Sequence, residues 1–210
     1  MGKRLIDLAF DELRGMLGSL ASIASEALGH ARKCLEECSG KDLEALRSYA
    51  RSAYKLRIDI LDFATEMLAR FQPVAADLRL LQALMSASYD FYRITRYAFE
   101  IVRTLLTIEC RGCEMSLACE AWSNVEEMMS LARKAILELD EDAALKVMRL
   151  DGVVDEAYTA GLSRMKDREC IDRCLVAEAM VLRHLERIAD HLTYVASETV
   201  YAVKGVREFV

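Results

Sequence analysis

Proline occurs only once in this chain, at Pro73, and glycine occurs nine times. Strand-forming residues do not alternate with polar residues over any useful length, whereas apolar residues recur at spacings of three and four. Between residues 6 and 37 this spacing places Leu13, Leu17 and Leu20 on one helical face. Because so few residues can end a helix, the sequence predicts an all-α fold of long helices joined by short loops.

The pattern predicts six helices. They cover roughly residues 6–37, 42–70, 73–106, 123–139, 142–164 and 169–203. Pro73 can open the third helix in its first turn, and residues 109–119, with one glycine and three cysteines, connect the two halves. We therefore expect two tandem antiparallel three-helix bundles, residues 1–108 and residues 109–210.

The two halves share an internal repeat. Residues 55–59 of the second helix correspond to residues 151–155 of the fifth. Residues 92–94 of the third helix correspond to residues 186–188 of the sixth. The repeat is diverged but in register, so the first half serves as an internal control for the second.

The composition indicates a folded protein and argues against nucleic-acid binding and membrane insertion. The 210 residues are 53% hydrophobic and 30% charged, which suits a sizeable core. The net charge is −6 with Lys and Arg scattered among acids, which argues against nucleic-acid binding. No apolar run reaches the roughly 20 residues of a membrane span, and the N-terminus meets acidic residues too early for a signal peptide. A soluble, cytoplasmic protein is expected.

Seven cysteines are many for such a chain. They are Cys34, Cys38, Cys110, Cys113, Cys119, Cys170 and Cys174. Asn and Gln are scarce, which is typical of proteins from hot environments, where intracellular disulfides are common. Most of the cysteines are expected to be small core residues, and bridging between helices or chains is the alternative. Zinc bound by Cys110, Cys113 and Cys119 would need a fourth ligand.

Two pairs of carboxylates carry the functional prediction. Asp151 and Asp155 lie four residues apart on the fifth helix, and Glu186 and Asp190 lie four apart on the sixth. Like charges at this spacing share a helix face and repel each other. The first pair falls in a largely apolar stripe and is expected to face the core, while the second pair falls at the border of one. If the two helices are neighbours, four carboxylates converge on a cation such as iron, zinc, manganese or magnesium.

Ordinary ion pairing is the alternative for these acids. Arg149, Arg183 and Arg187 are close enough in the sequence to pair with them. Arg187 is expected to form such a pair, with direct phosphate contact as the alternative. His191, which follows Asp190, is expected at a surface or interface, with metal ligation as the alternative. Both side chains would lie around the predicted ion.

The first half lacks the acidic pairs. Its corresponding positions are Lys55, Asp59, Tyr92 and Arg96, which set one carboxylate against two cations. We therefore expect Lys55, Asp59 and Arg96 to form ion pairs and to hold no metal.

An enzyme with a carboxylate-bridged dimetal site is a rival function. Its ferritin-like form needs Glu-x-x-His on two helices, and this sequence contains none. No Ser or Cys nucleophile with a His base and no glycine-rich phosphate loop is recognisable either. A non-catalytic protein is therefore favoured, and a purely structural or transporter-accessory bundle is the third possibility.

The second half resembles the PhoU family. Residues 185–191, Leu-Glu-Arg-Ile-Ala-Asp-His, followed by Glu198, Tyr201 and Gly205, look like the closing helix of PhoU proteins. The pair Asp151 and Asp155 looks like the partner motif on the preceding helix. Residues 72–79 match the family's helix-opening segment, so the resemblance covers nearly the whole chain.

This resemblance implies two three-helix bundles, a multinuclear metal cluster held by acid-x-x-x-Asp motifs, and a homodimer. It also implies a negative regulator of phosphate uptake and signalling. The implied partners are the ATPase of a phosphate ABC transporter and a sensor histidine kinase. Metal binding, expected for iron or zinc, carries over to Asp151, Asp155, Glu186 and Asp190. It does not carry over to the first half, where the motif is lost.

Overall fold

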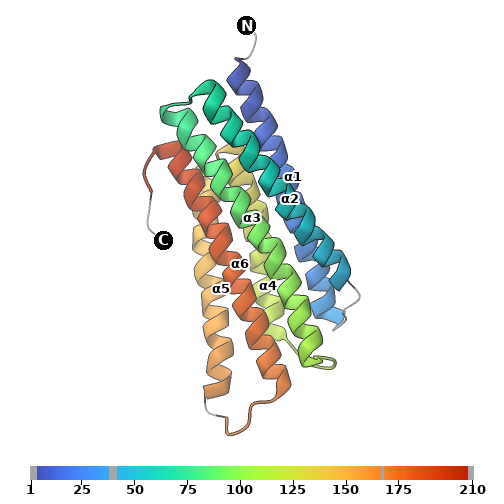
Figure 1. Ribbon diagram of the computed structural model, residues 1–210. Coiled ribbons are helices and arrows are strands. Elements are labelled where there is room, and N and C mark those ends of the chain that lie inside the picture. Colours follow the sequence, from blue (N-terminus) through green and yellow to red (C-terminus); the bar gives the residue numbers. More distant parts are fainter. Residues whose placement is uncertain (1–3, 38–41, 167, 208–210) are drawn as a thin grey trace.

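The computed structural model describes residues 4–37, 42–166 and 168–207. Within these residues the chain forms six α-helices and no strand, so the predicted all-α fold class is confirmed. The helices are α1 (Leu5–Glu37), α2 (Leu43–Phe71), α3 (Ala75–Ile108), α4 (Ser116–Glu138), α5 (Glu141–Lys166) and α6 (Arg173–Lys204). Figure 1 shows that they run roughly along one another in an elongated bundle.

Helices α3 and α6 lie side by side and join the two halves of the molecule (Figure 1). Helices α1 and α2 pack against α3 and against each other. Helices α4 and α5 pack in the same way with α6, and α1 also contacts α4. The helices that carry the two carboxylate pairs, α5 and α6, are therefore neighbours within one three-helix group.

The buried face of each helix follows the period of the sequence. On α1, Leu13, Leu17 and Leu20 are fully buried, and alanines continue the same stripe toward the end of the helix. Small side chains let helix backbones approach closely, while Trp122 of α4 and Phe91 of α3 fill the wider parts of the core. Helical periodicity together with this packing positions α5 and α6.

Helix α2 ends at Phe71 and is capped by Gln72, which has a left-handed backbone conformation with φ 46°, and Pro73 follows this cap directly. Because proline has no N–H to donate, it cannot continue α2. Helix α3 begins at Ala75 with Val74 as its cap, so Pro73 precedes the helix and does not lie in its first turn as predicted.

Helix α4 begins at Ser116, well before the predicted start near residue 123. The reason is a cap supplied by another helix. The buried carboxylate of Glu178 on α6 accepts hydrogen bonds from the backbone N–H groups of Leu117, at 2.9 Å, and Ala118, at 3.4 Å. Arg164 of α5 neutralises this carboxylate at 2.9 Å. Local sequence could not predict this start because the capping residue lies about sixty positions away.

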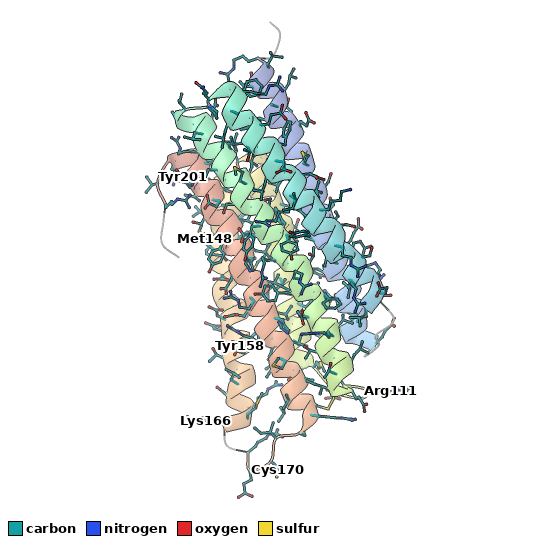
Figure 2. All side chains as sticks on the ribbon, viewed as in Figure 1. Arg111, Met148, Tyr158, Lys166, Cys170 and Tyr201 are labelled. Carbon is teal, nitrogen blue, oxygen red and sulfur yellow. A yellow bond between two sulfur atoms is a disulfide. The ribbon has the colours of Figure 1, made fainter. Side chains whose placement is uncertain are left out.

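A disulfide joins Cys113, in the connection between α3 and α4, to Cys174 at the start of α6, with a Cα–Cα distance of 5.2 Å. Figure 2 shows that Arg111 and Cys170, which flank these two positions, lie at the same end of the bundle. The expected role as small core residues is therefore wrong for this pair, and bridging between elements is confirmed. A thiolate zinc site that uses Cys113 is not present, since its sulfur is bonded to Cys174. Cys38 lies outside the described residues.

Across residues 4–37, 42–166 and 168–207, none of the helices combines the length and the apolar character that crossing a membrane requires.

Candidate metal centre on α5 and α6

The four predicted carboxylates lie on the two packed helices, Asp151 and Asp155 on α5 and Glu186 and Asp190 on α6. They affect one another across the helix contact. Asp155 and Asp190 both raise the pKa of Asp151, and Asp190 and Asp155 both raise the pKa of Glu186. The structure therefore brings the two pairs into one region of concentrated negative charge.

Asp151 is the most perturbed member of the set. Burial, followed by repulsion from Asp155 and then Asp190, raises its pKa from 3.8 to about 6, and the neighbouring Thr193 hydroxyl opposes this shift. Its Oδ1 atom is buried and has no hydrogen-bond partner. A buried acceptor without a donor is costly, so this oxygen is available to a cation.

Glu186 is similarly placed, with its side chain 15% exposed. Its Oε1 accepts a hydrogen bond from Arg183 at 2.5 Å, while its Oε2 is buried without a partner. Burial raises its pKa, Asp190 adds to the rise, and Arg183 opposes it. Each helix of the pair thus supplies one unpartnered buried carboxylate oxygen.

Asp190 and Asp155 lie nearer the solvent. The Asp190 side chain is 23% exposed and accepts a hydrogen bond from Arg187 at 2.6 Å. The expectation that Asp155 faces the core is wrong, because its side chain is exposed. On α5 the buried stripe passes through Val147, Val154 and Gly161, which leaves Asp155 on the outer side of that stripe.

Ion pairs already engage two of the four carboxylates. Arg183 and Arg187 hold Glu186 and Asp190, as the alternative from the sequence predicted, while Arg149 makes no ion pair with any residue that the structure describes. Among the described residues no three His, Cys, Asp or Glu side chains stand close enough together to hold one ion. The oxygen-rich set fits a hard or borderline cation, but the arginine-bound carboxylates would have to turn toward it.

The corresponding region of the first half is built differently from the prediction. Arg96 pairs with Glu100 on its own helix at 3.5 Å, so the expected ion-pair set of Lys55, Asp59 and Arg96 is wrong. Lys55 and Asp59 are exposed on α2, and no ion pair joins them within the residues that the structure describes. The sequence analysis did not identify Glu100 as the partner of Arg96, because Glu100 lies beyond the positions that correspond to Glu186 and Asp190.

A model of the PhoU domain matches residues 17–105 and, a second time, residues 120–199. The chain belongs to the PhoU family. The two matches fall one on each half of the chain, and the predicted resemblance is confirmed.

Two relatives illustrate the range of similarity within the PhoU family. A protein of Synechocystis sp. is 37% identical over 142 residues, which cover 65% of this chain and 63% of that protein. A protein of Pseudomonas aeruginosa is 27% identical over 207 residues, which cover 93% of this chain and 84% of that protein. Both carry the name phosphate-specific transport system accessory protein PhoU homolog.

Two crystal structures share the fold. PhoU from Pseudomonas aeruginosa superposes with a TM-score of 0.86 at 25% identity, over 95% of this chain and 99% of that one. The phosphate transport system regulatory protein PhoU from Streptococcus pneumoniae superposes with a TM-score of 0.88 at 20% identity, over 98% of this chain and 100% of that one. The second likeness concerns the fold alone.

In this PhoU-family chain His191 is directed away from the four carboxylates. Its Nδ1 lies 2.8 Å from Oδ1 of Asp90 on α3, and both side chains are buried. Burial raises the pKa of Asp90, and the contact with His191 opposes that rise. The expected surface or interface position is wrong, because His191 is buried in the contact between α3 and α6, and its predicted place around the ion stays a prediction. Asp90 was missed, although its place in the apolar stripe before Phe91 and Ile94 is a usable signal.

Arg187 connects the carboxylates to the same α3–α6 contact. Besides Asp190, it reaches the hydroxyl of Tyr97 on α3, to which Arg93 also donates a hydrogen bond at 2.9 Å. Burial alone would raise the pKa of Tyr97, but Arg187 and Arg93 together lower it. The two repeat-equivalent arginines therefore meet at one phenol, which the sequence did not indicate.

Proposed function

We propose that this protein is a non-catalytic regulator of phosphate uptake and that it binds metal at the α5–α6 carboxylates. Membership of the PhoU family supports the role, because relatives are named phosphate-specific transport system accessory proteins. The unpartnered buried oxygens of Asp151 and Glu186, on neighbouring helices, are the observation that carries the metal site. The ion is iron or zinc, both of which accept carboxylate oxygen.

The residues have separate roles in this proposal. Asp151 and Glu186 would hold the ion through their unpartnered oxygens, and Asp155 and Asp190 would have to turn toward it to complete the set of donors. A bound cation supplies the positive charge that keeps these carboxylates ionised. An ion held here would compete with Arg187 for the Asp190 carboxylate, and Arg187 also contacts Tyr97 on α3.

The proposed partners are the ATPase of a phosphate ABC transporter and a sensor histidine kinase, and the proposed state is a homodimer. A ferritin-like dimetal enzyme is less well supported, since the sequence has no Glu-x-x-His motif. Light scattering of the purified protein tests the dimer, and a monomeric mass would contradict it.

Metal analysis tests the site directly. Wild-type protein, an Asp151→Asn/Glu186→Gln double variant and an Asp59→Asn control are loaded with zinc or ferrous iron, desalted and measured by mass spectrometry of the elements. The control changes an exposed acid on α2, outside the site. We expect wild type and control to retain stoichiometric metal and the double variant to lose most of it. Equal metal in all three proteins would show that the site is wrong.

The regulatory role has its own test. Tagged wild-type protein is recovered from cells that express the phosphate transporter, and the eluate is probed for the transporter ATPase. We expect the ATPase to co-purify with wild type and to be reduced with the double variant. Its absence from wild-type eluates at both low and high phosphate would favour a purely structural bundle.

A further inference from the structure

A groove between α2 and α3 in the first half has a volume of about 500 Å³ and serves none of the roles described above. Its lining includes Arg47, Arg51, Tyr54, Tyr92, Arg96 and Phe99. By the internal repeat, Tyr92 and Arg96 occupy the places of Glu186 and Asp190 in the second half. The first half therefore presents cations and aromatic rings where the second half presents carboxylates.

The groove carries more positive than negative charge. Arg51 is exposed and makes no ion pair with any residue in the described part of the chain. Arg47 pairs with Glu44 at 3.1 Å, but the Glu44 side chain is 74% exposed, so this pair is weak. Arg96 shares Glu100 with Arg103, which lies closer, at 2.5 Å against 3.5 Å for Arg96. The guanidinium groups of the lining are thus only partly neutralised.

The Phe99 ring contacts two of these guanidinium groups. The guanidinium carbon of Arg47, on α2, lies 5.8 Å from the centroid of the buried Phe99 ring, and that of Arg96, on α3, lies 5.7 Å from it. Such contacts orient a guanidinium while leaving its N–H edge free to donate. The Tyr54 and Tyr92 rings stand 5.6 Å apart and inclined by 60°, and Tyr54 is 51% exposed. An open aromatic surface therefore adjoins the cations.

We propose that this groove binds a nucleoside polyphosphate. Arginine guanidinium groups match phosphate oxygens in two-point hydrogen bonds, and an exposed tyrosine ring offers a stacking surface for a base. The volume of about 500 Å³ lies within the range typical of small-molecule sites. An acidic protein segment would use the cations but would leave the exposed Tyr54 ring without a stacking partner.

The groove is separate from the carboxylate site. Within the described residues α2 packs only against α1 and α3, whereas the carboxylates lie on α5 and α6. Nucleotide binding at the groove therefore does not depend on metal binding, and either proposal can fail alone. Titrations in excess EDTA remove any binding bridged by a metal ion.

Calorimetric titration in EDTA tests the phosphate part. Adenosine triphosphate, tripolyphosphate and adenosine are titrated into wild type, Arg51→Glu and Arg149→Glu. Arg149 is a matched control, since it is also exposed and unpaired in the described structure but lies on α5. We expect Arg51→Glu to weaken the binding of adenosine triphosphate and of tripolyphosphate about tenfold or more, because a charged hydrogen bond is lost. Arg149→Glu should have little effect on either affinity. Equal losses in both variants, or no binding by wild type, would overturn the proposal.

The Tyr54→Ala variant tests the ring part, and because Tyr54 is half exposed this change should leave the fold intact. We expect this variant to bind adenosine triphosphate about tenfold more weakly, because one stacking contact is lost, and to bind tripolyphosphate as wild type does. If both ligands bind wild type equally and Tyr54→Ala changes neither, the nucleoside part is wrong. A polyglutamate peptide that displaces adenosine triphosphate and binds more tightly would replace the nucleotide with an acidic protein partner.

Discussion

Replacing Asp151 by asparagine should stabilise the metal-free protein near neutral pH. Asp151 has a pKa of about 6 in the folded protein against an ordinary value of 3.8, so its ionised form is disfavoured by folding. The difference corresponds to about 3 kcal/mol, and solvent screening of this partly buried group reduces it to about 1–2 kcal/mol. Asparagine has nearly the same shape and no charge, and it therefore removes this cost.

The sign of the pH dependence follows from the raised pKa. Below its unfolded pKa, Asp151 is protonated in both states and contributes no penalty. As the pH rises through about 6 the folded protein must ionise it, and the penalty becomes complete above that pH. The gain from Asp151→Asn should therefore be largest at about pH 8 and should fall toward zero at about pH 4.

Urea denaturation in EDTA across this pH range measures the effect, with the disulfide intact in every sample. Asp59→Asn is the control, because Asp59 is exposed on α2 and its variant should change little at any pH. A loss of stability in Asp151→Asn at high pH, or a gain that does not vary with pH, would refute the reasoning. With zinc or iron added, the order should reverse, since only wild type binds the ion at full affinity.

Three further predictions concern contacts between distant parts of the chain. Cys174→Ser opens a loop of 61 residues and should lower the free energy of unfolding by about 4 kcal/mol, as measured by urea denaturation under non-reducing conditions. An unchanged urea midpoint would show that the disulfide is not formed. Glu178→Ala should cost about 2 kcal/mol and unprotect the first amides of α4 in hydrogen exchange, and unaltered protection there would contradict the cap. His191→Ala leaves Asp90 buried without its partner and should lower the free energy of unfolding by about 3–5 kcal/mol, and an Asp90→Asn/His191→Gln double variant should recover part of that loss. Equal stability of His191→Ala and wild type would exclude a stabilising pair.

The carboxylate site shows how far sequence reasoning reaches. The four-residue spacing correctly placed Asp151 within one helix and Glu186 within another, because helical periodicity is a local property, whereas the contact between α5 and α6 came from the tertiary packing. It failed for Asp155, since one step around α5 separates the buried stripe from the solvent. It also could not show which oxygens lack partners, because that depends on where Arg183 and Arg187 direct their side chains.

The sequence by itself determined the helices, the internal repeat and membership of the PhoU family, because each can be recognised from spacings of a few residues or from a short motif. Only the tertiary structure decided where α4 begins, which cysteines bond, and that His191 meets Asp90 instead of the carboxylates. These contacts join residues about 60 to 100 positions apart. No periodic pattern relates such positions, so only the packing of α3, α5 and α6 could bring them together.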